Sequence, residues 1–180
     1  MNNKTTRWMA MIVVALTLWG CGKSDDAAYN ATNGAQTSDA LINPQHAGAG
    51  DYAAQCLSCH GAQGIGQEAL QAPALTSLDS VYIARQLRHF RDGVRGAHPE
   101  DTHGSIMAAS SAGLSDASIT DLAGYIDALP NVLPAATIKG DVAQGEDYHL
   151  NLCSACHGSN ALGNVALEAP ALAGLNDWYV

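Results

Sequence analysis

The pattern Cys-x-x-Cys-His occurs twice in this 180-residue chain, at residues 56–60 and 153–157. The two copies belong to a longer repeat, because residues 55–83 align with residues 152–180 without a gap at an offset of 97. Thirteen of the twenty-nine aligned positions are identical. Self-similarity at a fixed spacing indicates duplication of one structural unit. Any fold of this chain must therefore present the same short motif twice.

A cysteine pair followed by histidine has the chemistry of covalent haem attachment. The two thiols can add to the vinyl groups of one haem, and the adjacent histidine can reach its iron. Cys-x-x-Cys alone also occurs in thioredoxin-like and zinc sites, but both copies here carry the histidine and lie too far apart to favour one shared zinc site. We therefore expect two haem c groups. The predicted attachment and iron-binding residues are Cys56, Cys59 and His60 for the first, and Cys153, Cys156 and His157 for the second.

The second axial ligand decides whether a haem iron carries electrons or binds small molecules. From Cys21 onward the chain contains a single methionine, Met107, forty-seven positions after His60. A thioether ligand raises the reduction potential of the iron, so Met107 is our predicted second ligand of the first haem. The alternative candidates are His98 and His103.

The N-terminus has the pattern of an export signal. Lys4 and Arg7 precede an apolar run, and Cys21 follows in LWGC, which resembles the lipobox at which bacterial lipoproteins are lipidated. We predict a lipoprotein signal peptide at residues 1–20, lipidation of Cys21 and a flexible polar tether at residues 21–45. An ordinary cleaved signal peptide is the alternative, and it also implies export.

Composition narrows the fold class and the partners. Hydrophobic residues make up 47% of the chain, charged residues 14%, and there are eighteen glycines, which is typical of compact helical modules joined by glycine turns. The net charge of -9 argues against binding nucleic acid, because a polyanion would be repelled. It is compatible with docking onto a basic protein.

Apolar periodicity predicts an all-α chain. The segments that lead into the two motifs lack proline and glycine and are expected to be helical. Residues 80–92 should form a second helix with Ser80 as its N-cap. Residues 114–130 should form a third, capped by Ser115 or Asp116. Its apolar stripe consists of Ile119, Leu122, Ala123, Ile126 and Leu129.

Four arginines are expected on one face of the second of these helices, where they could pair with haem propionates, form a docking patch or face solvent. They are Arg85, Arg88, Arg91 and Arg95.

The first repeat resembles a class I cytochrome c. The resemblance rests on CxxCHG, then APAL, then the stretch at residues 82–96, a methionine and a closing helix. The doubled arrangement is similar to the di-haem cytochromes c of the c4 type, which are periplasmic electron carriers that feed terminal oxidases. It implies a tandem class I cytochrome c fold, with domain 1 at residues 46–134 and the N-terminal part of domain 2 at residues 135–180.

The resemblance also implies roles for individual residues. His60 and Met107 would be the axial ligands of the first haem, and His157 the proximal ligand of the second. The Pro73 and Pro170 loops would each place a backbone carbonyl against the ring N–H of the proximal histidine. The implied function is one-electron transfer between a membrane-bound reductase and an oxidase, without catalytic residues, by a periplasmic protein anchored through lipid to a bacterial membrane.

The second repeat departs from this pattern. At an offset of 97 the counterpart of Met107 falls at position 204, and no methionine, histidine or cysteine follows His157. We expect a truncated second domain, because half a domain would leave apolar surface exposed. The alternatives are a haem-bearing subunit of an oxidase or dehydrogenase complex, or an open haem that acts in a peroxidase or binds a ligand.

Overall fold

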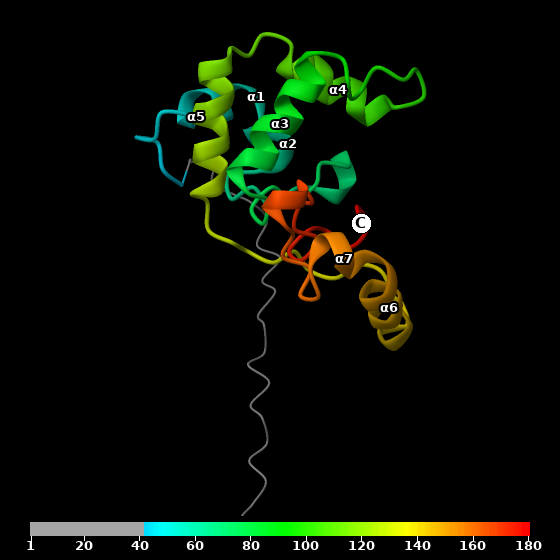
Figure 1. Ribbon diagram of the computed structural model, residues 1–180. Coiled ribbons are helices and arrows are strands. Elements are labelled where there is room, and N and C mark those ends of the chain that lie inside the picture. The colour runs from blue at the N-terminus through cyan, green and yellow to red at the C-terminus, as the bar shows by residue number, and fades with distance from the viewer. Residues whose placement is uncertain (1–41) are drawn as a thin grey trace, which may run out of the picture. The chain divides into compact units, whose positions relative to one another are not determined.

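The computed structural model describes residues 42–180, so the predictions for the signal peptide, for Cys21 and for most of the tether lie outside it. Within this range every regular element is a helix or a helical turn, as predicted (Figure 1). No helix between residues 42 and 180 is both long and apolar enough to cross a bilayer. The elements are α1 (Ala49–Gln55), α2 (Leu57–His60), η1 (Glu68–Leu70), α3 (Ser80–Arg91), α4 (Thr102–Ser111), α5 (Asp116–Asp127), α6 (Val142–Tyr148), the π-helical η2 (His149–Cys153), α7 (Ser154–His157) and η3 (Val165–Leu167).

The core of the first repeat forms around α5, which contacts both α1 and α3 (Figure 1). All five residues of the predicted apolar stripe are buried, so this prediction is confirmed. On α3, Ile83, Leu87 and Phe90 are buried on the face predicted by their spacing. On α1, Tyr52 packs its ring 4.9 Å from the ring of Tyr125. Burial of such side chains contributes about 1.5–3 kcal/mol each and fixes how the three helices pack.

The N-cap of α5 is a residue that the sequence predicted, whereas the N-cap of α3 is not. Ser115 caps α5, and its Oγ accepts a hydrogen bond from the backbone N–H of Ser118 at 3.0 Å. The prediction that Ser80 caps α3 is wrong, because the cap is Asp79, whose carboxylate accepts from the N–H of Tyr82 at 2.8 Å. A carboxylate caps this helix better than a serine hydroxyl would, because its negative charge also interacts favourably with the dipole at the helix N-terminus.

Helix α4 was not expected from the sequence. Apart from His103, Ile106 and Met107 its residues are small, and they have no apolar periodicity of the kind that marks α5. The one local signal is Asp101, whose side chain caps the helix by accepting from the N–H of Gly104 at 2.8 Å. The helix is held in place by its packing against α3. It matters for function because it carries His103 and Met107, which lie one turn apart on the same face.

The two repeats have the same local backbone at an offset of 97 residues. Each has a glycine with positive φ after the motif histidine and an isolated antiparallel bridge further along the chain. Between the two bridged residues, each has one residue in the left-handed conformation. Such a match in unusual conformations supports the duplication seen in the sequence. These features are Gly61 and Gly158, the bridges Gln67–Ala72 and Asn164–Ala169, and the residues Gln71 and Glu168.

One inserted residue is accommodated by a π-helical turn. The second repeat has one more residue than the first between its Asp-Tyr pair and its first motif cysteine, and η2 lies in that interval. In the first repeat Tyr52 donates from its hydroxyl to the carbonyl of Gly61 at 2.6 Å. In the second, His149 and not Tyr148 takes this position, with its Nε2 3.0 Å from the carbonyl of Gly158. The π-turn therefore restores the register that the insertion would have shifted.

The segment that joins the repeats is held by one carboxylate. Asp177 accepts hydrogen bonds from the N–H groups of Thr137 at 2.6 Å and Ile138 at 2.7 Å, and from the hydroxyl of Thr137 at 2.8 Å. The N–H of Trp178 adds a fourth bond at 2.9 Å. These donors, with that of Ile138 the strongest, lower the pKa of the Asp177 carboxyl below its usual value.

The Asp177 contact should make stability depend on pH in acid. Because the pKa of this group is lower in the folded protein than in the unfolded chain, where it is about 3.9, the stabilisation is complete above that value and is lost as the pH falls through the folded pKa. We expect Asp177→Asn to be less stable than the wild type by a constant amount near neutral pH, and by a shrinking amount below about pH 4. Urea unfolding at several pH values measures this. A difference that stayed constant down to pH 3 would contradict it.

Candidate haem-binding site

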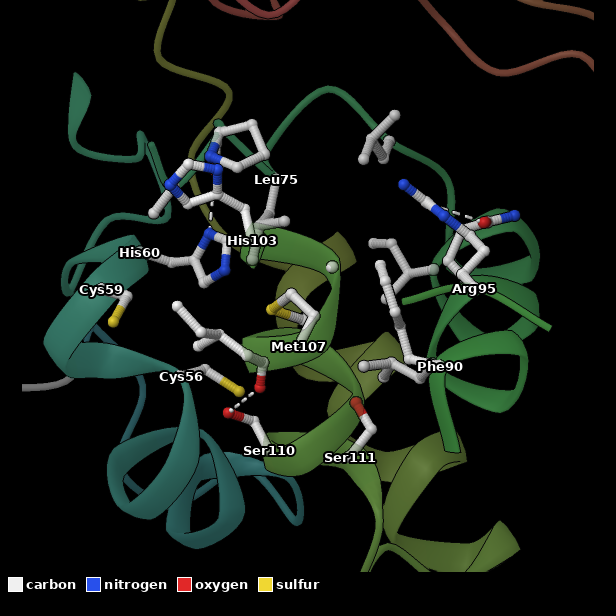
Figure 2. Close-up of a pocket in the computed structure, with 18 of the residues that line it drawn as sticks. Cys56, Cys59, His60, Leu75, Phe90, Arg95, His103, Met107, Ser110 and Ser111 are labelled. Carbon is white, nitrogen blue, oxygen red and sulfur yellow. Dashed lines mark hydrogen bonds between the residues drawn. The ribbon is translucent and has the colours of Figure 1, made fainter. Parts of the chain in front are cut away.

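The first motif opens onto a cavity of about 260 Å³. The cavity is lined by Cys56, Cys59 and His60 on one side and by His103 and Met107 of α4 on another (Figure 2). The structure thus brings together candidate haem-binding residues that lie up to fifty-one positions apart in the sequence. His98, the other histidine considered as a ligand, does not line this cavity.

The ring of His60 is held by a hydrogen bond to a backbone carbonyl. His60 is the last residue of α2 and is 5% exposed, and its Nδ1 lies 2.8 Å from the oxygen of Pro73. A carbonyl can only accept, so Nδ1 carries the proton and Nε2 presents a lone pair. Burial lowers the pKa of His60, although the Pro73 carbonyl opposes this. The imidazole is therefore neutral near pH 7, which is the form that binds metal ions.

Figure 2 shows the second ring nitrogen of His60 and the sulfur of Met107 directed toward each other. Met107 is half-buried, and it packs against the core cluster. A nitrogen ligand and a sulfur ligand on opposite sides of a cavity suit an iron between them. His103 lines the same cavity from the preceding turn of α4 and is exposed. Ligation by Met107 stays a prediction.

The loop that brings Pro73 to His60 depends on a glycine. Gly66 has φ of +76°, and a Cβ on it would collide with the carbonyl oxygen of Ala72 and the carbonyl carbon of Pro73. Its N–H donates to the carbonyl of His60 at 3.1 Å. Only glycine combines this backbone conformation with such a close approach. The chain can therefore turn back beneath the histidine and present the Pro73 carbonyl to the ring.

The motif thiols differ between the two repeats. Cys56 and Cys59 are half-buried and Cys153 and Cys156 are exposed, and all four are free. Burial raises the pKa of the Cys56 thiol to about 12, with smaller contributions from Asp51 and Cys59. Cys56 is thus kept as a neutral thiol beside the cavity.

The walls of the cavity fit a haem. They are mainly apolar, as a macrocycle requires, and they include Leu75, Leu78 and Leu114. Ser111 also lines the cavity, and its buried hydroxyl has no hydrogen-bond partner in the described part of the chain. Arg95 supplies a positive charge at the wall. Two thiols, a neutral imidazole, apolar faces and one cation together match the groups of haem c and its carboxylates.

Arg95 differs from the other three arginines. It lies beyond the end of α3, so the expectation of four arginines on one helix is wrong. Its guanidinium stacks 4.4 Å from the centre of the Phe90 ring and donates to Gln86 at 2.9 Å. Within residues 42–180 it has no carboxylate partner. The other three form ion pairs, which are Arg85–Glu168, Arg88–Asp116, Arg91–Asp92 and Arg91–Asp116.

The histidine of the second motif contacts a proline carbonyl in the same way as the histidine of the first. The Nδ1 of His157 lies 2.8 Å from the oxygen of Pro170, the same distance as in the first repeat. The fold therefore holds a second imidazole in the same orientation relative to its proline loop.

Comparison with known proteins gives the family. Residues 45–130 match the family model described as cytochrome c. The chain belongs to the cytochrome c family. Membership implies a haem c and the role of an electron carrier, and the helices have the class I cytochrome c fold, as the sequence predicted.

Two curated relatives that cover most of this chain are themselves longer than it. The thiosulfate dehydrogenase electron acceptor of Thiomonas intermedia is 37% identical over 138 residues, which cover 71% of this chain and 60% of that protein. A protein of the same name from Stutzerimonas stutzeri is 33% identical over 156 residues, which cover 81% of this chain and 68% of the relative. The chain thus spans about three fifths to two thirds of the length of these two proteins.

A solved structure shares the fold. Cytochrome c4 of Acidithiobacillus ferrooxidans superimposes with a TM-score of 0.58 at 28% sequence identity, over 71% of this chain and 76% of the other. The cytochrome c4 resemblance inferred from the doubled motifs is therefore supported at the level of the fold.

The bond between Tyr52 and the Gly61 carbonyl should stabilise the site. Tyr52 is fully buried, so Tyr52→Phe leaves a buried carbonyl without its donor and should cost about 1–3 kcal/mol of unfolding free energy. Chemical denaturation of the haem-loaded protein measures the loss. The matched control is Tyr148→Phe, which removes the hydroxyl of a tyrosine that is 58% exposed and should change stability by less than about 0.5 kcal/mol. Equal losses in the two variants would show that the buried bond has no special role.

Proposed function

We propose that this protein accepts single electrons from a periplasmic dehydrogenase and passes them to a respiratory acceptor such as a terminal oxidase. The observation that carries the proposal is the neutral imidazole of His60, fixed by Pro73 with its free nitrogen directed toward Met107 in a cavity that also holds two thiols. The two relatives named as thiosulfate dehydrogenase electron acceptors favour a dehydrogenase of this kind as the donor.

The residues of the first site have separate roles in this proposal. Cys56 and Cys59 would attach the haem through thioethers, His60 and Met107 would bind its iron, and Pro73 fixes the histidine ring. When bound, the haem supplies one-electron exchange between ferric and ferrous iron. With both of these ligands bound, the iron would rearrange little between the two oxidation states, and no coordination position would remain for a substrate.

The second repeat is proposed to bind a second haem c. Cys153 and Cys156 would attach it, and His157, oriented by Pro170, would bind its iron. We assign residues 46–134 to domain 1 and residues 135–180 to the N-terminal part of domain 2. The recurrence of the same turns and of the same histidine–proline bond supports this assignment.

We also propose that the protein is exported to the periplasm and anchored through lipid on Cys21. The support is the charged, then apolar, then LWGC pattern at the N-terminus. Mass spectrometry of the protein extracted from its own membranes tests this together with the length of the natural chain.

Haem content tests the two attachment sites. We expect two covalently bound haems per wild-type chain, and one in each of the double variants Cys56→Ala/Cys59→Ala and Cys153→Ala/Cys156→Ala. The intact mass and the pyridine haemochrome spectrum of the full-length protein measure this. A wild-type protein with a single haem, or a second double variant that keeps two, would refute the second site.

The sixth ligand can be tested by carbon monoxide binding to the reduced protein. In a Cys153→Ala/Cys156→Ala background, which isolates the first site, Met107→Ala should change carbon monoxide binding from none to one per haem, because it opens a coordination position. The control is His103→Ala, the other α4 side chain at the cavity, and it should remain closed. The opposite result would make His103 the ligand.

The donor can be tested with isolated proteins. We expect rapid reduction of the carrier by a thiosulfate dehydrogenase and thiosulfate together, and none by thiosulfate alone. Stable co-purification with a catalytic subunit would instead favour a fixed subunit of a larger complex over a free carrier.

A further inference from the structure

One peptide group connects the first haem site to the second repeat. The carbonyl of Pro73 accepts the hydrogen bond from Nδ1 of His60 at 2.8 Å, and the N–H of Ala74 donates to Oδ1 of Asn176 at 2.6 Å. These two groups are the two ends of the same amide. His60 and Asn176, which are 116 residues apart in the sequence, are therefore linked by two hydrogen bonds through one peptide unit.

The linkage is shielded from water. Ala74 is fully buried, His60 is 5% exposed and Asn176 is 8% exposed. Water therefore competes little for either bond, and in such surroundings hydrogen bonds in series polarise one another. When the amide N–H donates, electron density moves toward the carbonyl oxygen, which becomes a stronger acceptor.

We propose that Asn176 is a positioning residue that adjusts the electron-donating strength of His60 through the Pro73–Ala74 amide. A stronger acceptor on Nδ1–H makes the imidazole a more basic ligand. A more basic ligand favours ferric over ferrous iron, so this contact should lower the reduction potential of the first haem. The inference rests on the proposed binding of haem at His60.

The second repeat provides an internal comparison. Its histidine–proline bond has the same length, but the N–H of Ala171, the counterpart of Ala74, has no hydrogen-bond partner among residues 42–180. At the offset of 97 the counterpart of Asn176 is Asp79, which caps α3 and is not directed to the other proline loop. A residue of the second repeat therefore acts on the first site, and in the part of the chain that the structure describes no equivalent residue of the first repeat acts on the second.

Other contacts hold the second repeat against this site without Asn176. Arg85 forms an ion pair with Glu168 at 2.8 Å and also donates to its backbone carbonyl at 2.6 Å. Leu175 and Tyr179 of the second repeat line the cavity of the first site. A change at Asn176 should therefore remove the hydrogen bond while the two repeats stay together.

The test uses the full-length, haem-loaded protein and three variants. Asn176→Leu removes the acceptor, and Asn176→Asp replaces it with a charged one, which forms a stronger hydrogen bond. Glu168→Gln is the control, because it weakens another contact between the repeats and removes a negative charge but leaves the Ala74 bond in place. Redox titration followed by NMR signals of the haem methyl groups reports the first and second haems separately.

Asn176→Leu should shift the ferrous-to-ferric ratio of the first haem by about two-fold toward ferrous at a fixed ambient potential, and Asn176→Asp should shift it toward ferric. The Nδ1 proton resonance of His60 should move upfield in Asn176→Leu and downfield in Asn176→Asp. The second haem should be unchanged by Asn176→Leu.

Three results would overturn the inference: no shift in either Asn176 variant, shifts of the same sign in both, or an equal shift in Glu168→Gln. A failure of this kind in protein that retains its covalent haem leaves the proposed function intact. A wild-type protein without haem at Cys56 and Cys59 would refute the proposed function itself.

Discussion

The hydrogen bond from His60 to the Pro73 carbonyl is the interaction on which the site depends. A buried imidazole with an unpaired Nδ1–H would be costly, and its ring would be free to turn. The bond removes that cost and leaves Nε2 as the only free nitrogen. It also explains the surrounding chain, since Gly66 permits the loop to pass beneath the histidine and Tyr52 fixes the carbonyl of the residue that follows it. The helices of the core hold these pieces at fixed positions relative to Met107.

Duplication kept this arrangement while much of the sequence around it changed. The histidine–proline distance is the same in both repeats, although the tyrosine that supports the first motif is replaced by His149 in the second. The π-turn absorbs the one-residue difference in length before the motif. The hydrogen bond of the motif histidine to its proline loop was therefore retained, whereas the side chain that bonds the glycine after it changed from tyrosine to histidine. The two motifs differ mainly in their surroundings, because the second repeat lines part of the first cavity and the cysteines of the second motif are exposed.

The sequence predicted those features that have a strong local or chemical pattern. The two motifs carry their own chemistry, and the stripe on α5 has a clear helical period, so both could be identified in advance. Helix α4 could not, because it has only the Asp101 cap as a local signal and is held by tertiary packing. The cap of α3 was misplaced by one residue since Asp79 and Ser80 are both good capping residues. The bond between Ala74 and Asn176 spans 102 positions, and no local pattern reports it.

The ion pairs of α3 change how the proposed carrier should meet its partners. A row of arginines on an acidic protein suggested a basic docking patch, but Arg85, Arg88 and Arg91 are paired with carboxylates of the same chain. Arg95 lines the cavity, and its guanidinium is engaged with the Phe90 ring and with Gln86. With these charges satisfied internally and a net charge of -9, the field around the protein is negative. Long-range attraction would then favour partners with basic surfaces, and it would weaken as salt screens the charges. The arginines thus serve the internal structure of the carrier, and its acidic surface is the part that a redox partner would meet.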